Sequence, residues 1–458
     1  MAQTVDVARL IDDRKLDAFN WAVIIWSFVI IVFDGYDIAA ISASAPLVMK
    51  AWGVTNPGVF MGTVISASLF GMLFGAPILG YLGDGFGRRT ATMISSLWFG
   101  VFTLAACWAS DLETLRILRF LAGIGIGGMM PNLIALNAEY APRRVRATLI
   151  IIMFCGVTLG GAFPGFAAVY LSPTYGWQVI YAIGGVVPIV LAGLAYFVLP
   201  ESLKFLVVKS KRAEAEKLVR RLSPGTAVSS ATQFVIAEEG KANSSLSPAK
   251  LFKGALAYIT PLLWLCFCMN LMGFYFMVAW MPTILRVSGV LTPDDAQFAT
   301  VLIQIGGTVG GLLLARPMDK RGFAPVTVLF ALAVPAIAGI GFFAASSKDL
   351  VMACAFLAGF CVLGLQFGIN AASGMIYPTA VRSNGSGWAF GIGRFGSILG
   401  PILGGYFIAQ HLPLDRLFLL WTIPSIIGFI AALSLTMLYK AHFKGLGLGQ
   451  REALEAAE

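Results

Sequence analysis

The sequence predicts an all-α membrane protein in which twelve transmembrane helices form two six-helix bundles. Three observations lead to this fold class. Hydrophobic residues make up 58% of the 458 residues and charged residues only 12%, whereas about a quarter of a soluble domain is charged. Apolar windows long enough to cross a bilayer recur twelve times. The second half of the sequence also repeats features of the first.

Each apolar window holds about 20 residues, the length that an α-helix needs to cross about 30 Å of hydrocarbon. In chain order the windows are centred near Ile30, Phe70, Phe99, Gly127, Thr158, Val187, Met272, Gly307, Val334, Phe360, Ile398 and Phe429. They divide the chain into a cytoplasmic N-terminus (1–20), an N-terminal bundle (21–199), a cytoplasmic linker (200–253), a C-terminal bundle (254–440) and a cytoplasmic tail (441–458).

The internal repeat is found when the sequence is shifted by about 235 residues. The matched pairs include Gly71 with Gly306, Gly75 with Gly310, Asp84 with Asp319, Arg146 with Arg382 and Gly160 with Gly396. Because the lag spans six helices, the two copies should have the same orientation, related by an axis along the membrane normal. The linker is therefore expected to join two bundles that rock against each other.

The basic residues predict the orientation of the chain. Nearly all Lys and Arg lie in the N-terminus, the linker, the tail and every second turn. By the positive-inside rule, both termini are cytoplasmic. The net charge of +9 is thus a signal of topology, and nucleic-acid binding is not expected because the basic residues are spread over many short turns.

The ends of the chain and its cysteines exclude other classes of protein. The first twenty residues have no apolar region followed by a cleavage site, so no signal peptide is expected. The six cysteines fall inside apolar spans, and Cys266 and Cys268 point to different helix faces. Neither a disulfide framework nor a zinc site is predicted.

Two aspartates, Asp34 and Asp37, lie in the first apolar span. A carboxylate at bilayer depth costs about 3 kcal/mol even on a lenient scale, so ionisable residues there are functional by default. The two stand about 60° apart on a helix, so that ionisation of one disfavours ionisation of the other. The pair is predicted to carry the transported proton; a structural ion pair is the alternative.

Three further ionisable residues lie within spans. Arg394 is about nine residues into the eleventh span, near the midplane, where its guanidinium can hold a substrate carboxylate through two hydrogen bonds. The alternative is a tie to a backbone carbonyl. Arg119, near the outer face, either takes part in proton coupling, snorkels to the surface or pins the packing of the helices. Glu139 is a further coupling candidate, although bracing the gate with the arginines at 143–146 is favoured.

Aromatic and amide side chains on the seventh, tenth and eleventh spans can stack on an aromatic ring and read its hydroxyls. For each of them packing is the alternative. These candidates are Tyr275, Trp280, Gln366, Asn370 and Trp388. Asp34, Asp37 and the Tyr36 between them are further candidates for substrate contact.

The turn after the second span reads Gly80-Tyr-Leu-Gly-Asp84-Gly-Phe-Gly87-Arg88-Arg89, and it resembles the cytoplasmic loop signature of the major facilitator superfamily. The glycines allow close approach of helices, Asp84 can meet the N-terminal end of a partner helix, and the arginines can anchor to the membrane surface. A weaker copy, Asp319-Lys320-Arg321, occupies the matching turn of the second half. Both turns are predicted to gate the inward–outward change.

Further motifs extend the resemblance over nearly the whole chain. They are Arg119 with the glycines at 123–127, Glu139 to Arg146, Pro200-Glu201-Ser202, and Tyr377 to Arg382. Asp34-Gly35-Tyr36-Asp37 is similar to the acidic pair of the aromatic acid:proton symporters. This resemblance implies a monomer that imports benzoate-like or hydroxybenzoate-like anions with protons across a bacterial inner membrane by alternating access.

The energy source follows from a separate argument. A negative-inside potential opposes a monoanion by about 2.3 kcal/mol per 100 mV, so accumulation needs at least one accompanying proton. The glycine run at 123–128 lies mid-helix, without the residues of a nucleotide loop, so the proton gradient is the expected driving force and no cofactor is expected.

Two other functions remain open. The first is export of an aromatic acid or drug by proton antiport, and the second is a membrane receptor that senses an aromatic acid without moving it. An enzyme is not expected, since the sequence shows no nucleophile–base pair and no metal constellation.

Overall fold

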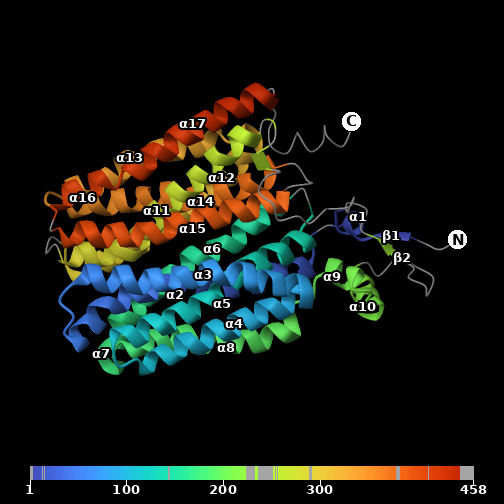
Figure 1. Ribbon diagram of the computed structural model, residues 1–458, viewed down its shortest axis with the longest axis horizontal. Coiled ribbons are helices and arrows are strands. Elements are labelled where there is room, and N and C mark those ends of the chain that lie inside the picture. Colours follow the sequence, from blue (N-terminus) through green and yellow to red (C-terminus); the bar gives the residue numbers. More distant parts are fainter. Residues whose placement is uncertain are drawn as a thin grey trace.

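The computed structural model describes residues 4–12, 14, 16–142, 145–222, 233–235, 251–252, 254, 256–287, 291–377, 382–410 and 412–443. Within the described residues, twelve helices are long and apolar enough to cross a membrane. They form two bundles that lie side by side in Figure 1, the N-terminal one coloured blue to green and the C-terminal one yellow to red. The predicted fold class is confirmed, and the protein is a multi-pass membrane protein.

The spanning helices of the N-terminal bundle are α2 (Ala18–Trp52), α3 (Pro57–Phe86), α4 (Arg88–Ala105), α5 (Leu112–Tyr140), α6 (Arg146–Phe166) and α8 (Gln178–Val198). Three short elements lie between them: η1 (Ala106–Trp108), the π-helical η3 (Ala167–Leu171) and α7 (Ser172–Tyr175). Those of the C-terminal bundle are α11 (Leu256–Val287), α12 (Pro293–Arg321), α13 (Ala324–Phe343), α14 (Lys348–Ile376), α15 (Arg382–Ala409) and α17 (Ile423–Phe443), the last preceded by α16 (Leu414–Leu420).

Local sequence signals set the ends of several helices. Asp17 caps α2 by accepting the backbone N–H groups of Phe19 and Asn20, and the Asn20 side chain accepts from the Asp17 backbone in return. Gly53 ends the same helix with a left-handed φ of 66°. Asp111 caps α5 through Thr114, at 2.8 Å, and these hydrogen bonds hold the pKa of the Asp111 carboxyl below its usual value.

The repeated glycines explain how the helices pack within each bundle. A Cβ added to Gly71 would overlap the backbone oxygen of Phe120 in α5, and one added to Gly306 would overlap that of Phe356 in α14. Glycine therefore allows α3 to lie directly against α5, and α12 against α14. The two helix pairs are equivalent in the repeat, so the structure bears out the internal symmetry of the sequence.

A small unit lies at one end of the bundles, which we call the linker end (Figure 1). It contains β1 (Thr4–Asp6), α1 (Val7–Asp12), α9 (Leu203–Val208), α10 (Arg212–Leu222) and β2 (Gln233–Val235). The two three-residue strands pair in parallel, with Thr4 opposite Gln233. This sheet was not foreseen in the sequence, because neither segment has the length or alternation that predicts a strand.

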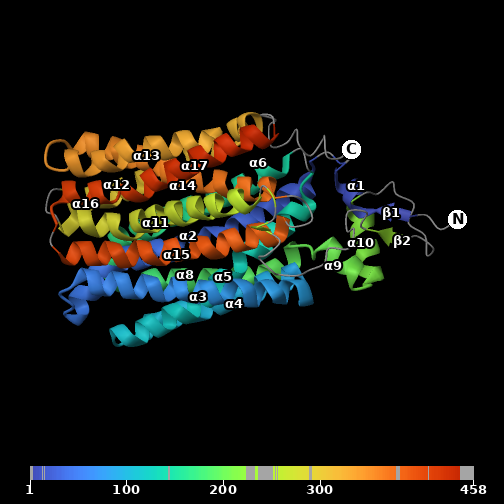
Figure 2. The same cartoon turned by 45° about the horizontal axis from the view of Figure 1, so that its top comes forward.

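The two bundles meet mainly along three helix pairs, which are α3 with α15, α6 with α12, and α2 with α11; α3 also touches α11, and α6 touches α14. Figure 2 shows α15 lying beside α3 along much of their length. Helices α2 and α11 are the first helices of their bundles, and each carries polar residues at mid-depth. Candidate residues on these two helices therefore lie close to the surface where the bundles face each other.

Candidate functional site

Asp34 and Asp37 lie in the middle of the longest helix of the N-terminal bundle. Asp34 follows the start of α2 by about 24 Å in a helix of roughly 50 Å. Each aspartate is 1% exposed. Burial of two carboxylates at this depth is costly unless positive charge or protons neutralise them.

Asp37 forms an ion pair with Arg119 of α5. The Arg119 guanidinium also donates to the hydroxyls of Ser68 in α3, at 3.3 Å, and Thr103 in α4, at 3.4 Å. It lies over the ring of Tyr181 in α8, 5.9 Å from its centroid. Arg119 does not snorkel, since it is fully buried; it neutralises Asp37 inside the N-terminal bundle.

Asp34 has a different environment. Among the described residues, neither of its carboxylate oxygens has a hydrogen-bond partner. The positive charge that acts on Asp34 electrostatically is that of Arg394 in α15, in the other bundle. Asp34 is therefore a buried carboxyl group that no hydrogen bond holds in place, opposite a cation across the bundle interface.

Arg394 is held by residues of both bundles. Its guanidinium donates to the Tyr275 hydroxyl of α11, at 3.0 Å, and contacts the Met72 sulfur of α3, at 3.8 Å. These partners are a hydroxyl and a thioether, so the tie to a backbone carbonyl is not seen among the described contacts. A guanidinium has five N–H donors, which leaves donors of Arg394 available for a ligand carboxylate.

Other polar contacts close the bundle interface, one near Ser42 on the side of Asp34 away from the linker end and one at the depth of Asp34. The Ser42 hydroxyl of α2 donates to the carbonyl of Ala279 in α11, at 2.5 Å. Thr158 of α6 and Thr308 of α12 share a hydrogen bond of 2.5 Å. Ser42 follows Asp34 by about two helix turns, so the Ser42–Ala279 contact closes the interface between the aspartates and the far end.

Three amide side chains form a row in the C-terminal bundle. Asn270 of α11 donates to Gln366 of α14, at 2.8 Å, and Gln366 donates to Asn370, also at 2.8 Å. The structure thus brings together two of the amides expected to contact substrate and adds Asn270. The signal that could have found Asn270 was an amide in an apolar span five residues before Tyr275.

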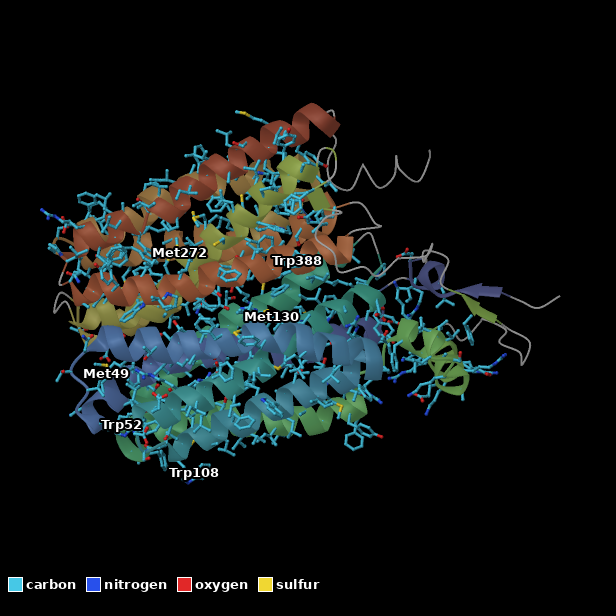
Figure 3. The ribbon with its side chains drawn as sticks, in the orientation of Figure 1. Met49, Trp52, Trp108, Met130, Met272 and Trp388 are labelled. Carbon is cyan, nitrogen blue, oxygen red and sulfur yellow. The ribbon has the colours of Figure 1, made fainter. Side chains whose placement is uncertain are left out.

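The remaining aromatic candidates make packing contacts in this conformation. The Tyr36 hydroxyl donates to the Ile180 carbonyl at 2.8 Å, within the N-terminal bundle. The Trp280 indole donates to the Pro401 carbonyl at 3.1 Å and is fully buried. Trp388 stacks on Trp264, 6.1 Å between ring centroids, and lies nearer the linker end than Met272 in Figure 3.

The predicted gate turn is organised by Glu201, which follows α8. Its carboxylate accepts the backbone N–H of Arg89 at 3.0 Å and that of Ser202 at 2.8 Å. Gly87 begins α4 with a φ of 106°, and a Cβ there would overlap the Glu201 carboxylate. The carboxylate at the N-terminal end of α4 is therefore that of Glu201. Asp84 was expected to meet the N-terminal end of a helix, but its side chain lies outside the described part of the structure.

The other gate residues have separate environments. Arg88 donates to Asn132 at 3.3 Å, and Arg89 lies over Tyr196, 5.1 Å from the ring centroid. These two arginines therefore contact protein groups. Gly80 is half-buried and Arg321 is exposed. The side chains of Asp319 and Lys320 lie outside the described part of the structure.

Glu139 accepts a hydrogen bond of 2.5 Å from the Ser202 hydroxyl. This contact joins the linker end of α5 to the segment that follows α8, next to the Glu201 cap. The arginines expected to pair with Glu139 fall outside the description, since residues 143 and 144 are not described and the side chain of Arg146 is not either.

Comparison with known proteins identifies the family. Residues 27–331 and 289–453 match the profile of the Major Facilitator Superfamily. A gallate transporter of Pseudomonas putida is 35% identical over 94% of this chain and 95% of its own. A 4-hydroxybenzoate transporter of Acinetobacter baylyi is 35% identical over 93% of both chains, and a benzoate transport protein of the same species is 34% identical over 94% of this chain and 92% of its own.

Solved structures show the same fold at lower identity. The partially occluded, inward-open xylose transporter XylE of E. coli has a TM-score of 0.66 at 18% identity, covering 93% of this chain and 98% of its own. A bacterial homologue of the lysosomal transporter Spinster has a TM-score of 0.63 at 16% identity, covering 94% and 99%. The resemblance expected from the loop motifs is confirmed, and the chain belongs to the major facilitator superfamily of transporters rather than to a class of enzymes.

Proposed function

We propose that the protein imports aromatic monocarboxylates together with protons across a bacterial inner membrane, by alternating access and as a monomer. The observation that carries this proposal is that Asp34, a buried carboxyl without hydrogen-bond partners among the described residues, lies in the electrostatic field of Arg394 from the other bundle. The relatives that transport gallate, 4-hydroxybenzoate and benzoate support the substrate class.

In the proposed mechanism, Asp34 and the substrate carboxylate compete for Arg394. When Asp34 is protonated, the Arg394 guanidinium can hold the substrate carboxylate, with the Tyr275 hydroxyl beside it. When Asp34 loses its proton, a second negative charge near Arg394 weakens substrate binding. A proton therefore enters with the substrate, and its loss promotes release of the substrate.

Asp37 and Arg119 serve this cycle as a neutral pair inside the N-terminal bundle. Since the pair lies one helix turn from Asp34 on α2, it sets the electrostatic environment in which Asp34 gains and loses its proton. A break in the pair would leave a charge in the membrane interior, so we assign it to coupling rather than to substrate contact.

We assign the linker end to the cytoplasm and the structure to an inward-facing state. The positive-inside bias supports the first assignment. The second is supported by the Ser42–Ala279 contact, which seals the interface between the aspartates and the far end. Rocking of the bundles would break this seal and open the site to the outside.

The test uses the purified protein in proteoliposomes with labelled 4-hydroxybenzoate. We expect uptake driven by an inward proton gradient, and acidification of the lumen when substrate alone is supplied outside. Uptake driven only by an outward proton gradient would assign export instead. Saturable binding without flux in any gradient would assign the receptor function.

A further inference from the structure

The amide row of Asn270, Gln366 and Asn370 has a defined direction. Asn270 Nδ2 donates to the Val362 carbonyl at 3.2 Å as well as to Gln366 Oε1. A backbone carbonyl can only accept, so this contact fixes which end of the Asn270 amide faces α14. Gln366 must then accept with its oxygen, and its nitrogen donates to Asn370 Oδ1.

The last member of the row, Asn370, therefore presents its amide N–H₂ group to its surroundings. Asn270 is 3% exposed and Gln366 is 7% exposed, whereas Asn370 is only half-buried. Among the described residues no acceptor meets the Asn370 nitrogen. The open end of the row is thus a hydrogen-bond donor, and its partner must be an acceptor.

The row starts on the helix that also carries Tyr275, the hydroxyl partner of Arg394. Asn270 precedes Tyr275 by five residues, about 7.5 Å along α11, and the row continues from there toward the linker end. Phe367, next to Gln366, stacks on Phe154 of the other bundle, 6.0 Å between ring centroids. This side of α14 therefore faces the interface between the bundles, where the Arg394 guanidinium also lies through its contact with Met72 of the other bundle.

We infer that Asn370, oriented by Gln366 and Asn270, donates a hydrogen bond to an oxygen on the substrate ring, at the end remote from the carboxylate. The site then selects hydroxylated or methoxylated aromatic acids over acids with a methyl group at that position. This inference rests on the proposed function, because it takes Arg394 as the partner of the substrate carboxylate.

The donor character of Asn370 makes a specific chemical prediction. A ring hydroxyl and a ring methoxyl both offer an oxygen that accepts, whereas a methyl group of similar size to the hydroxyl offers none. A site built to hydrogen-bond a substituent rejects an analogue that lacks it, because the polar group of the protein is left unpaired. A row that served only to tie α11 to α14 would not distinguish these ligands.

The experiment measures affinities of the purified full-length protein for 4-hydroxybenzoate, 4-methoxybenzoate and 4-methylbenzoate. For the native protein we expect both oxygenated acids to bind more tightly than the methyl acid, by about tenfold. Asn370→Leu should abolish this preference by weakening the binding of both oxygenated acids, and it should strengthen the binding of 4-methylbenzoate, because no amide is then left unpaired. Gln366→Leu should reduce the preference in part, because Gln366 acts by orienting Asn370.

Two further variants sharpen the test. Asn370→Asp has the same shape but presents an acceptor, so it should bind 4-hydroxybenzoate, whose hydroxyl can donate, better than 4-methoxybenzoate, whose ether cannot. It also keeps the inference testable if Asn370→Leu does not fold. Thr300→Val removes a buried hydroxyl of α12 that donates to its own helix, and as a matched control it should leave the preference intact.

Equal losses for all three ligands in Asn370→Leu would show a purely structural role and overturn the inference. A native protein that favours 4-hydroxybenzoate but not 4-methoxybenzoate would also overturn it, since the site would then present an acceptor. If all three acids are transported and no variant alters the preference, only this inference fails. If the native protein neither binds nor transports any of them, the proposed function fails as well.

Discussion

Replacement of Asp34 by Asn separates proton coupling from transport. The substitution removes the charge and keeps the shape, so the variant resembles the protonated carboxyl permanently. Because neither carboxylate oxygen has a partner among the described residues, the change breaks no hydrogen bond there. It also relieves the cost of a buried charge, about 3 kcal/mol on the lenient scale. The variant should therefore fold, insert and bind substrate.

The expected loss of accumulation can be worked out from the driving forces. With one proton per anion, no net charge moves, and a gradient of one pH unit supports tenfold accumulation, about 1.4 kcal/mol. Without the proton, a potential of 100 mV excludes the anion by about 2.3 kcal/mol, or roughly 50-fold. With one pH unit and 100 mV imposed together, the steady-state ratio of substrate concentration inside to outside should thus be roughly 500-fold higher for the native protein than for Asp34→Asn.

The assay measures uptake of labelled 4-hydroxybenzoate into proteoliposomes under imposed gradients. A second measurement follows counterflow of the same substrate without any gradient. Asp34→Asn should retain counterflow and lose accumulation. Asp349→Asn, which removes an exposed carboxylate at the far end of α14, is the matched control and should accumulate normally. Accumulation by Asp34→Asn to the native ratio would refute the assignment of Asp34 as the proton carrier.

Three further predictions follow from the contacts around the site. Asp37→Asn should lower the free energy of unfolding by about 3–5 kcal/mol, because it leaves the fully buried Arg119 without its counter-charge. Thermal unfolding of the purified variant, compared with that of Asp34→Asn, checks this. Equal stability of the two variants would contradict it. Arg394→Lys should weaken binding of the acid, and Arg394→Ala should weaken it more, whereas the uncharged amide analogue should lose little in either; equal losses for acid and amide would assign Arg394 to helix packing. Glu201→Gln should slow turnover with little change in affinity, because Glu201 caps α4 at the gate turn and does not reach the site; a large loss of affinity with normal turnover would contradict it.

The sequence predicted the parts of the fold that depend on periodicity and composition. Hydrophobic length located the twelve spans, and the shifted glycines anticipated the equivalent packing of Gly71 and Gly306. The position of Arg394 in its span pointed to the midplane. These features are local, or repeat at a fixed lag, so they can be read along one chain.

The pairing of side chains from different helices could not be predicted in the same way. Asp37 and Arg119 are 82 residues apart, and only the packing of α5 against α2 and α4 brings them together. Glu201 caps α4 by accepting the backbone N–H of Arg89, which lies 112 residues earlier in the chain. The loop motif pointed to Asp84 instead. Asn270 was missed because an amide in an apolar span does not show which side chain it contacts, and its contact with Gln366 is visible only in the structure.

The most direct test of competition between Asp34 and the substrate is the number of protons taken up on binding. Calorimetric titration of 4-hydroxybenzoate in buffers of different ionisation enthalpy, at a pH where Asp34 is ionised in the free protein, gives this number. The account predicts uptake of about one proton per bound anion by the native protein, since the pKa of a carboxyl rises when a second negative charge approaches, and none by Asp34→Asn. Equal proton uptake by the two proteins, or none by the native protein at any pH, would contradict it.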